Sequence, residues 1–281
     1  MKKLLDPGLR SGLARGDGAD LYFERRGAGP ALLLISGGGG DSAYYAGLAD
    51  ILAADFTVVT YDRRGNSRSP LHGEARPLSV AEQSADAIAV LRANGFTAAL
   101  VFGNSGGATI ALDLATHHPA TVTAAVCHET PVPAVLPDPA PYLAIHDEMD
   151  KLLLSDGWQA AFRRFQTGIL GRLPGERITP APAREVLLRM SANWEFMTRY
   201  EIRSFIDYRP DVASIRGNHV RIALAYGATT THRAAPEMSR ALAARLSAEC
   251  AVLPGGHAGP QDDPAAFAAP LRELLGRTLA G

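Results

Sequence analysis

The sequence is poor in cysteine and has no excess of charge of either sign. Its 281 residues include only two cysteines, Cys127 and Cys250, both in apolar runs typical of strands. This usage indicates two buried free thiols in a reducing compartment, and not a disulfide scaffold. The 28 Lys and Arg residues nearly balance the 29 Asp and Glu residues. The charge therefore predicts neither nucleic-acid binding nor binding to a membrane surface.

Long apolar runs and leader-like segments are also missing. No apolar run reaches the length of a bilayer span, and no apolar segment follows the basic residues Lys2 and Lys3 as it would in a signal peptide. No spacing of His, Cys, Asp and Glu suggests a metal site. We therefore expect a cytoplasmic protein that acts on a small molecule without metal or cofactor, with a homodimer left open.

One stretch, residues 98–112, combines a short apolar run, a glycine-rich turn and a helix pattern. The turn reads Gly-Asn-Ser-Gly-Gly and places Ser105 between the predicted strand and the predicted helix. This is Gly-x-Ser-x-Gly in the context that a nucleophilic serine requires. Glycine leaves room for neighbouring backbone in so sharp a turn, and a helix N-terminus favours developing negative charge. The alternative is a glycine-rich turn with an idle serine.

Strands and helices alternate along most of the chain. Apolar patterns predict strands at 31–35, 56–61, 121–127, 220–226 and 250–253, and helices at 80–94, 234–246 and 264–279. Residues 20–26 have strand character, whereas the polar, glycine-rich residues 1–18 predict a loose arm. The alternation predicts an α/β fold with a mainly parallel sheet and helices on both faces.

The pattern changes between positions 131 and 217. Five prolines fall between positions 131 and 141, and helix patterns follow at 141–155, 157–170 and 182–205. Because this block lies between two predicted strands, we expect a helical cap at 131–217 inserted between core segments 1–130 and 218–281. Most of its aromatic residues would form a small helical core. We expect four of its residues to face the substrate: Trp158, Phe162, Trp194 and Met197.

Four motifs together resemble the α/β-hydrolase fold. They are the Ser36-Gly37-Gly38 turn after a strand, Asp62-Arg63-Arg64-Gly65, the turn around Ser105, and Gly255-Gly256-His257. The resemblance covers nearly all of the chain outside the predicted cap. It implies an eight-stranded, mostly parallel sheet with a cap inserted after strand six. It also implies a catalytic triad in the chain order serine, acid, histidine.

The resemblance assigns the general base and the oxyanion hole. It makes His257 the base, whose imidazole can take the serine proton and return it to the leaving group. The oxyanion hole needs two backbone N–H groups. We expect one from Gly106, directly after the serine, and one from Gly38, with Gly37 as the next candidate. A merely flexible loop is the alternative interpretation of the four glycines at 37–40.

The acid departs from the commonest pattern of the family, in which a carboxylate follows the seventh strand. That stretch, residues 227–232, has threonine at the expected position, and the next acid, Glu237, falls inside a predicted helix. Glu129 ends the sixth strand, 24 residues after Ser105. The haloalkane-dehalogenase branch of the fold is similar in this placement. Either the acid is lost and Glu129 is a surface carboxylate, or Glu129 is the acid, as we expect.

These residues and the resemblance predict a serine hydrolase that cleaves a carboxylic ester or lactone through an acyl-enzyme on Ser105. The same triad can also hydrolyse a carbon–carbon bond. The scaffold can alternatively serve as a cofactor-free biosynthetic tailoring enzyme or as a ligand-binding protein. An intact pair of Ser105 and His257 argues against a pure receptor.

Overall fold

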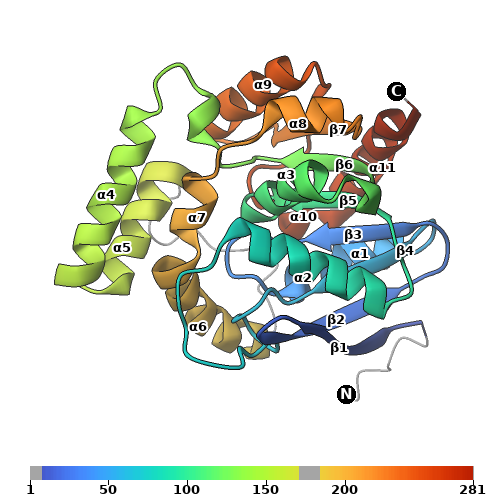
Figure 1. Cartoon of the computed structure of the whole chain (residues 1–281), viewed down its shortest axis with the longest axis horizontal. Coiled ribbons are helices and arrows are strands. Elements are labelled where there is room, and N and C mark those ends of the chain that lie inside the picture. The colour runs from blue at the N-terminus through green and yellow to red at the C-terminus, as the bar shows by residue number, and fades with distance from the viewer. Residues whose placement is uncertain (1–7, 171–183, 281) are drawn as a thin grey trace.

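The computed structural model describes residues 8–170 and 184–280. One eight-stranded sheet runs through the molecule in the spatial order β1-β2-β4-β3-β5-β6-β7-β8 (Figure 1). Strands β3 to β8 are parallel to one another, whereas β1 and β2 are antiparallel to their neighbours. The predicted mostly parallel eight-stranded sheet of the α/β-hydrolase fold is therefore confirmed.

The elements follow the predicted alternation closely. The strands are β1 (Arg10–Gly16), β2 (Ala19–Arg26), β3 (Ala31–Ile35), β4 (Thr57–Tyr61), β5 (Ala99–Asn104), β6 (Val122–His128), β7 (Ile222–Gly227) and β8 (Cys250–Leu253). The helices that pack on the sheet are α1 (Ala46–Leu52), α2 (Val80–Ala93), α3 (Gly106–His117), α8 (Val212–Gly217), α9 (Ala234–Leu246), α10 (Gly259–Asp262) and α11 (Pro264–Ala280). Of these, α8 falls within the range predicted for the cap, residues 131–217, but it contacts α3 and α9 of the sheet domain. Short helical turns lie at Ser42–Tyr45, Pro119–Thr121 and Pro133–Val135.

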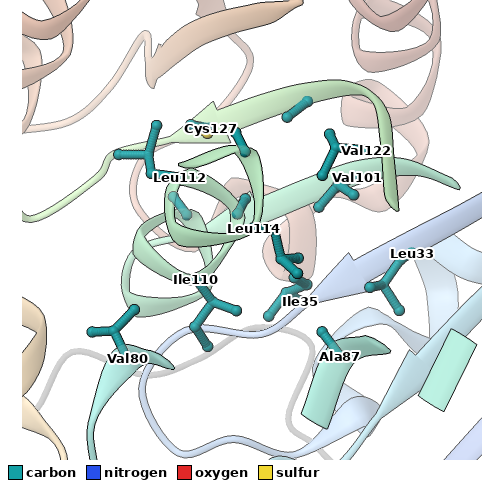
Figure 2. Close-up of a cluster of buried hydrophobic side chains, with 14 of the residues drawn as sticks. Leu33, Ile35, Val80, Ala87, Val101, Ile110, Leu112, Leu114, Val122 and Cys127 are labelled. Atoms are coloured by element: carbon teal, nitrogen blue, oxygen red, sulfur yellow. The ribbon is translucent and has the colours of Figure 1, made fainter. Parts of the chain in front are cut away.

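Alternate residues of the central strands enter two separate cores. Leu33 and Ile35 of β3 pack in the core that α2, α3 and α9 cover, and Figure 2 shows part of this core, including Ile110 of α3. Leu32 and Leu34 pack in the core on the other face, beneath α1 and α11. A strand buried on both faces needs apolar residues at every position. This explains the continuous apolar run at 31–35.

The predicted loose arm at residues 1–18 is wrong for its described part. Residues 10–16 form β1, which pairs antiparallel with β2 and leaves Asp17 and Gly18 as a two-residue loop. Asp-Gly is a strong hairpin signal, and Gly18 has the positive φ of +76° that such a turn needs. The composition was misleading because β1 is an edge strand with mostly exposed side chains. Residues 1–7 lie outside the described residues.

A group of helices stands between β6 and β7, as the prediction of a cap requires. It comprises α4 (Ala140–Ser155), α5 (Trp158–Phe165) with a π-helical turn at Gln166–Leu170, α6 (Arg184–Tyr200) and α7 (Ile202–Ile206). A separate hydrophobic cluster holds these helices together, with Met149, Phe165 and Met197 among its members. The predicted helix start at 182 lies outside the described residues. In Figure 1, α4, α5 and α6 stand to one side of the sheet domain.

Two further expectations concern the thiols and the membrane. Both cysteines are free, and Cys127 is buried, but Cys250 on the edge strand β8 is only partly buried. Among the described residues, no helix is both long enough and apolar enough to span a bilayer.

Candidate active site

Ser105 lies at the sharp turn between β5 and α3. Its backbone adopts φ 54° and ψ −124°, a strained conformation of the kind that clusters at functional sites. A Cβ atom at Gly107 would come within 2.1 Å of the Ile35 carbonyl oxygen, and one at Gly103 within 2.3 Å of the Gly107 oxygen. The two glycines that flank the serine are therefore required by close backbone packing.

His257 and Glu129 meet in the cavity that Ser105 also lines. His257 Nδ1 lies 2.6 Å from Glu129 Oε2. The other carboxylate oxygen accepts a hydrogen bond from the Gly227 amide at 2.9 Å and one from the Thr230 hydroxyl. Thr230 is the threonine that stands where the common family pattern has its acid, and here it binds the carboxylate that comes from β6. The glutamate side chain is 1% exposed, so protein groups supply its polar contacts.

The environment of Glu129 keeps its carboxyl group ionised. Burial alone would raise its pKa, but the hydrogen bond and the charge of His257 outweigh burial and bring the pKa to about 2. A carboxylate can only accept, so the imidazole must carry its proton on Nδ1. In the neutral ring, Nε2 is then unprotonated and can act as a base.

Asn104, together with His128, holds the backbone of the loop that carries His257. The Asn104 amide donates from Nδ2 to the His257 carbonyl oxygen at 3.1 Å and accepts from His128 Nδ1 at 2.9 Å. His128 is fully buried between the rings of Phe102 and Phe267, and burial lowers its pKa to about 4. It is therefore neutral at pH 7 and packs as a neighbour of the site. The role of Asn104 was not foreseen.

The expected oxyanion donors lie next to the serine. Gly37, Gly38 and Gly106 line the same cavity as Ser105 and His257. A Cβ atom at Gly37 would lie 2.8 Å from Ser105 Cβ, so this backbone runs directly past the serine. Gly106 is the first residue of α3, and the first N–H groups of a helix have no partner within it.

The cavity wall is formed partly by the cap. Trp194 and Met197 line it, together with Phe165, Ile202 and Phe205. Among its described lining residues, the only side chain of the Asp, Glu, Lys and Arg types is that of Glu129.

The other two expected substrate residues, Trp158 and Phe162, are not among the described lining residues. The Phe162 ring stacks on Trp194 with centroids 4.9 Å apart, and Trp158 contacts Phe162 in turn. They support the wall from behind. A helix pattern alone does not say which way such aromatic side chains point. Over residues 8–170 and 184–280, no group of three or more His, Cys, Asp and Glu side chains could hold a metal ion.

The site has a serine in a sharp turn after the central strand, and a histidine and a carboxylate that follow neighbouring strands. This is the arrangement of an α/β hydrolase. The chain belongs to the alpha/beta hydrolase family, whose model matches residues 32–269, and it is an enzyme of the hydrolase class. It is 30% identical over 256 residues to the uncharacterized hydrolase YraK of Bacillus subtilis, a match that covers 89% of this chain and 90% of YraK.

Solved structures have the same fold. An alpha/beta hydrolase from Sphaerobacter thermophilus superposes with a TM-score of 0.70 at 26% identity, over 94% of this chain and 99% of that one. A thermophilic esterase from Thermogutta terrifontis superposes with a TM-score of 0.73 at 17% identity, over 96% and 99% of the two chains. At that identity the second likeness shows the fold alone.

Proposed function

We propose that this hydrolase cleaves a neutral carboxylic ester or lactone through an acyl-enzyme on Ser105. The observation that carries the proposal is the 2.6 Å contact between His257 and Glu129, which lies in the same cavity as a serine on a strained turn. A buried carboxylate behind an imidazole has a clear use in acyl transfer, because it stabilises the imidazolium that forms when a serine loses its proton.

The reaction follows from the roles of these groups. Ser105 Oγ attacks the substrate carbonyl carbon while His257 Nε2 takes the hydroxyl proton. The Gly38 and Gly106 N–H groups bind the oxyanion of the tetrahedral intermediate. The carbon–oxygen bond to the alcohol then breaks, and the alcohol leaves with the proton from Nε2. Water, deprotonated by His257, attacks the acyl-enzyme and releases the acid and the free serine. In a lactone the alcohol stays attached to the acyl chain.

The character of the cavity supports a neutral, partly apolar substrate. Its described lining is rich in aromatic and aliphatic side chains and includes no lysine or arginine. The carboxylate of Glu129 already accepts hydrogen bonds from His257, Gly227 and Thr230. A negatively charged substrate would lose its hydration without gaining a cationic partner. Esters and lactones with apolar acyl or alcohol groups carry no charge, so they do not pay this desolvation penalty.

The test is a burst assay with p-nitrophenyl acetate and butyrate, combined with fluorophosphonate labelling. We expect wild type to release about one equivalent of nitrophenol in a burst and to take up one label. Ser105→Ala should show neither, and its kcat should fall by about 10⁶-fold, as for the loss of a triad serine. Ser155→Ala, at an exposed serine on α4, is the matched control and should behave as wild type. Labelling that persists in Ser105→Ala, or a wild type with neither burst nor label, would refute the proposal.

A further inference from the structure

One side of the cap helix α6 runs along the loop that carries the Gly38 amide. We call residues 37–41 the oxyanion loop. Side chains four residues apart lie on the same side of a helix, and Arg189, Asn193 and Met197 have this spacing. Glu201 continues it, because the helical hydrogen bond from the Glu201 amide to the Met197 carbonyl is present at 3.0 Å.

Each of the first three side chains meets a different residue of the oxyanion loop. Arg189 Nε donates to Asp41 at 2.8 Å, and Asn193 Nδ2 donates to the Gly39 carbonyl oxygen at 2.6 Å. Met197 covers Gly38 so closely that a Cβ atom there would lie 2.6 Å from its sulfur. The helix and the loop therefore run in opposite directions, with residue matched to residue.

The fourth side chain acts on the loop through Arg63. Glu201 and Arg63 form a buried ion pair with contacts of 2.5 and 3.0 Å, and Arg63 Nη2 donates to the Gly37 carbonyl oxygen at 2.9 Å. This carbonyl and the Gly38 N–H belong to one planar trans peptide, in which the two groups point in opposite directions. Arg63 thus sets the direction of the Gly38 N–H by binding the other side of its peptide.

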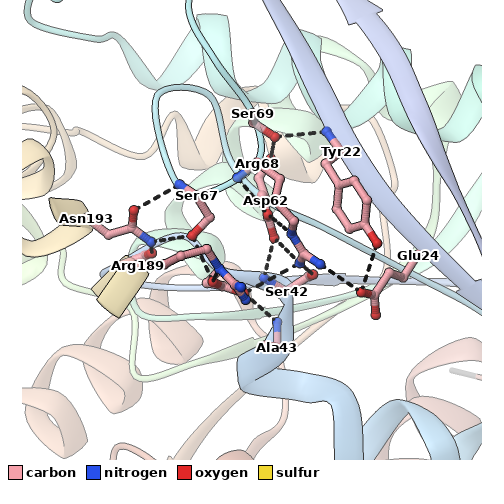
Figure 3. Close-up of polar contacts among 12 residues, drawn as sticks. Tyr22, Glu24, Ser42, Ala43, Asp62, Ser67, Arg68, Ser69, Arg189 and Asn193 are labelled. Atoms are coloured by element: carbon pink, nitrogen blue, oxygen red, sulfur yellow. Dashed lines mark hydrogen bonds and ion pairs between the residues drawn. The ribbon is translucent and has the colours of Figure 1, made fainter. Parts of the chain in front are cut away.

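Asn193 also contacts the neighbouring turn at Ser67, as Figure 3 shows. Its Oδ1 accepts from the Ser67 amide at 2.9 Å, and its Nδ2 donates to the Ser67 hydroxyl at 2.6 Å. Ser67 in turn donates to Asp41 at 2.7 Å. Asn193 is 2% exposed, so water does not readily replace these contacts if the side chain is removed.

We propose that α6 positions the oxyanion hole: the Gly38 N–H is aligned for catalysis only while Asn193 and Glu201 hold the oxyanion loop. Both are positioning residues, because neither needs to touch the substrate. The inference rests on the proposed function, in which Gly38 binds the developing oxyanion. It means that the cap is part of the catalytic machinery as well as a wall of the substrate cavity.

The kinetic test compares Asn193→Ala with Arg199→Ala, a matched control at the exposed surface of the same helix, where Arg199 pairs with Glu195. A misplaced oxyanion donor lowers stabilisation of the transition state and not binding of the substrate. Asn193→Ala should therefore lower kcat by about 10- to 100-fold with KM changed less than threefold. Its affinity for a trifluoromethyl ketone, which places an oxyanion in the hole, should fall by a similar factor. Arg199→Ala should match wild type in kcat, in KM and in affinity for the ketone.

Amide hydrogen exchange of peptides that span residues 37–41 separates this inference from the proposed function. We expect faster exchange in Asn193→Ala and Glu201→Gln, and wild-type exchange in Arg199→Ala. Unchanged exchange in Asn193→Ala would overturn the positioning role whether or not Ser105 is the nucleophile. Faster exchange with unchanged affinity for the ketone would overturn it too. Faster exchange in a protein whose Ser105 takes no fluorophosphonate would instead overturn the proposed function and leave the contact between α6 and the loop established.

Discussion

Replacement of Glu129 by glutamine tests the proposed triad most directly. Glutamine has the shape of glutamate and can keep an oxygen toward the Gly227 amide and the Thr230 hydroxyl, where Glu129 Oε1 accepts two hydrogen bonds. Its NH₂ group then faces His257 Nδ1, which lies 2.6 Å from the carboxylate in the wild type. Two donors cannot share that contact, so the imidazole proton moves to Nε2. The nitrogen that should take the serine proton is then already protonated.

The size of the effect follows from the coupling between the two groups. The pKa of Glu129 falls from the usual 4.5 to about 2, because the hydrogen bond and the charge of His257, with smaller contributions from His128 and Thr230, outweigh burial, which alone would raise it. This shift corresponds to about 3 kcal/mol in favour of the charged form, or more than a hundredfold in rate if all of it is lost in the transition state. The wrong tautomer adds to this loss. We expect kcat to fall by about 10³- to 10⁴-fold, as in other triads.

The assay is steady-state hydrolysis of p-nitrophenyl butyrate, with circular dichroism to show that the variant is folded. Thr230→Val is the matched control, because it removes one hydrogen bond to the same carboxylate and leaves the charge. It should cost less than about tenfold, in line with the loss of a single hydrogen bond. A folded Glu129→Gln that keeps more than about a tenth of wild-type kcat, or that loses no more than Thr230→Val, would show that Glu129 is not the triad acid.

Two further predictions concern stability. Burial lowers the pKa of His128 from 6.5 to about 4, so the unfolded chain binds a proton that the folded protein does not bind. The free energy of unfolding should therefore fall by up to about 3 kcal/mol as the pH falls from 6.5 to 4. Urea titrations at the two pH values should show a smaller fall in His128→Asn than in wild type. Equal falls in the two proteins would contradict the argument. Gly107→Ala should cost about 4 kcal/mol or more, because its Cβ would meet the Ile35 carbonyl oxygen at 2.1 Å. Gly276→Ala, in an open position of α11, should instead stabilise by about 0.5–1 kcal/mol, and thermal melts that rank the two alike would refute this.

The sheet and the serine turn were predictable because their signals are local. A run of five apolar residues at 31–35 indicates a doubly covered strand without reference to the rest of the chain. The glycines around Ser105 indicate a turn in which no side chain fits. The hairpin of β1 had a local signal too, the Asp17-Gly18 pair, but polar side chains on an edge strand concealed it. Glu129 was predicted only because the resemblance gave the usual position of the acid, after the seventh strand, and this sequence has threonine there.

The contacts that organise the site were not predictable, because they join residues far apart in the sequence. Asn104 meets the carbonyl of His257 across 153 positions, and Asn193 meets Gly39 across 154. In the sequence, nothing near these two buried asparagines distinguishes them from asparagines that lie at the surface. The same limit applies to the cap aromatics. Trp194 faces the cavity, whereas Phe162 lies behind it, and the difference depends on how α5 and α6 pack together.

The contact between the helical insertion and Arg63 has a consequence for engineering new substrate ranges. Glu201, which follows α6 within the insertion, pairs with Arg63, and Arg63 binds the Gly37 carbonyl oxygen. A cap transplanted from a relative would bring new walls for the substrate but a foreign partner for Arg63. Such a chimera should retain turnover only when residues 37–41 and 63 are exchanged together with the cap. The unit of recombination in this scaffold is therefore larger than the cap that the sequence delimits.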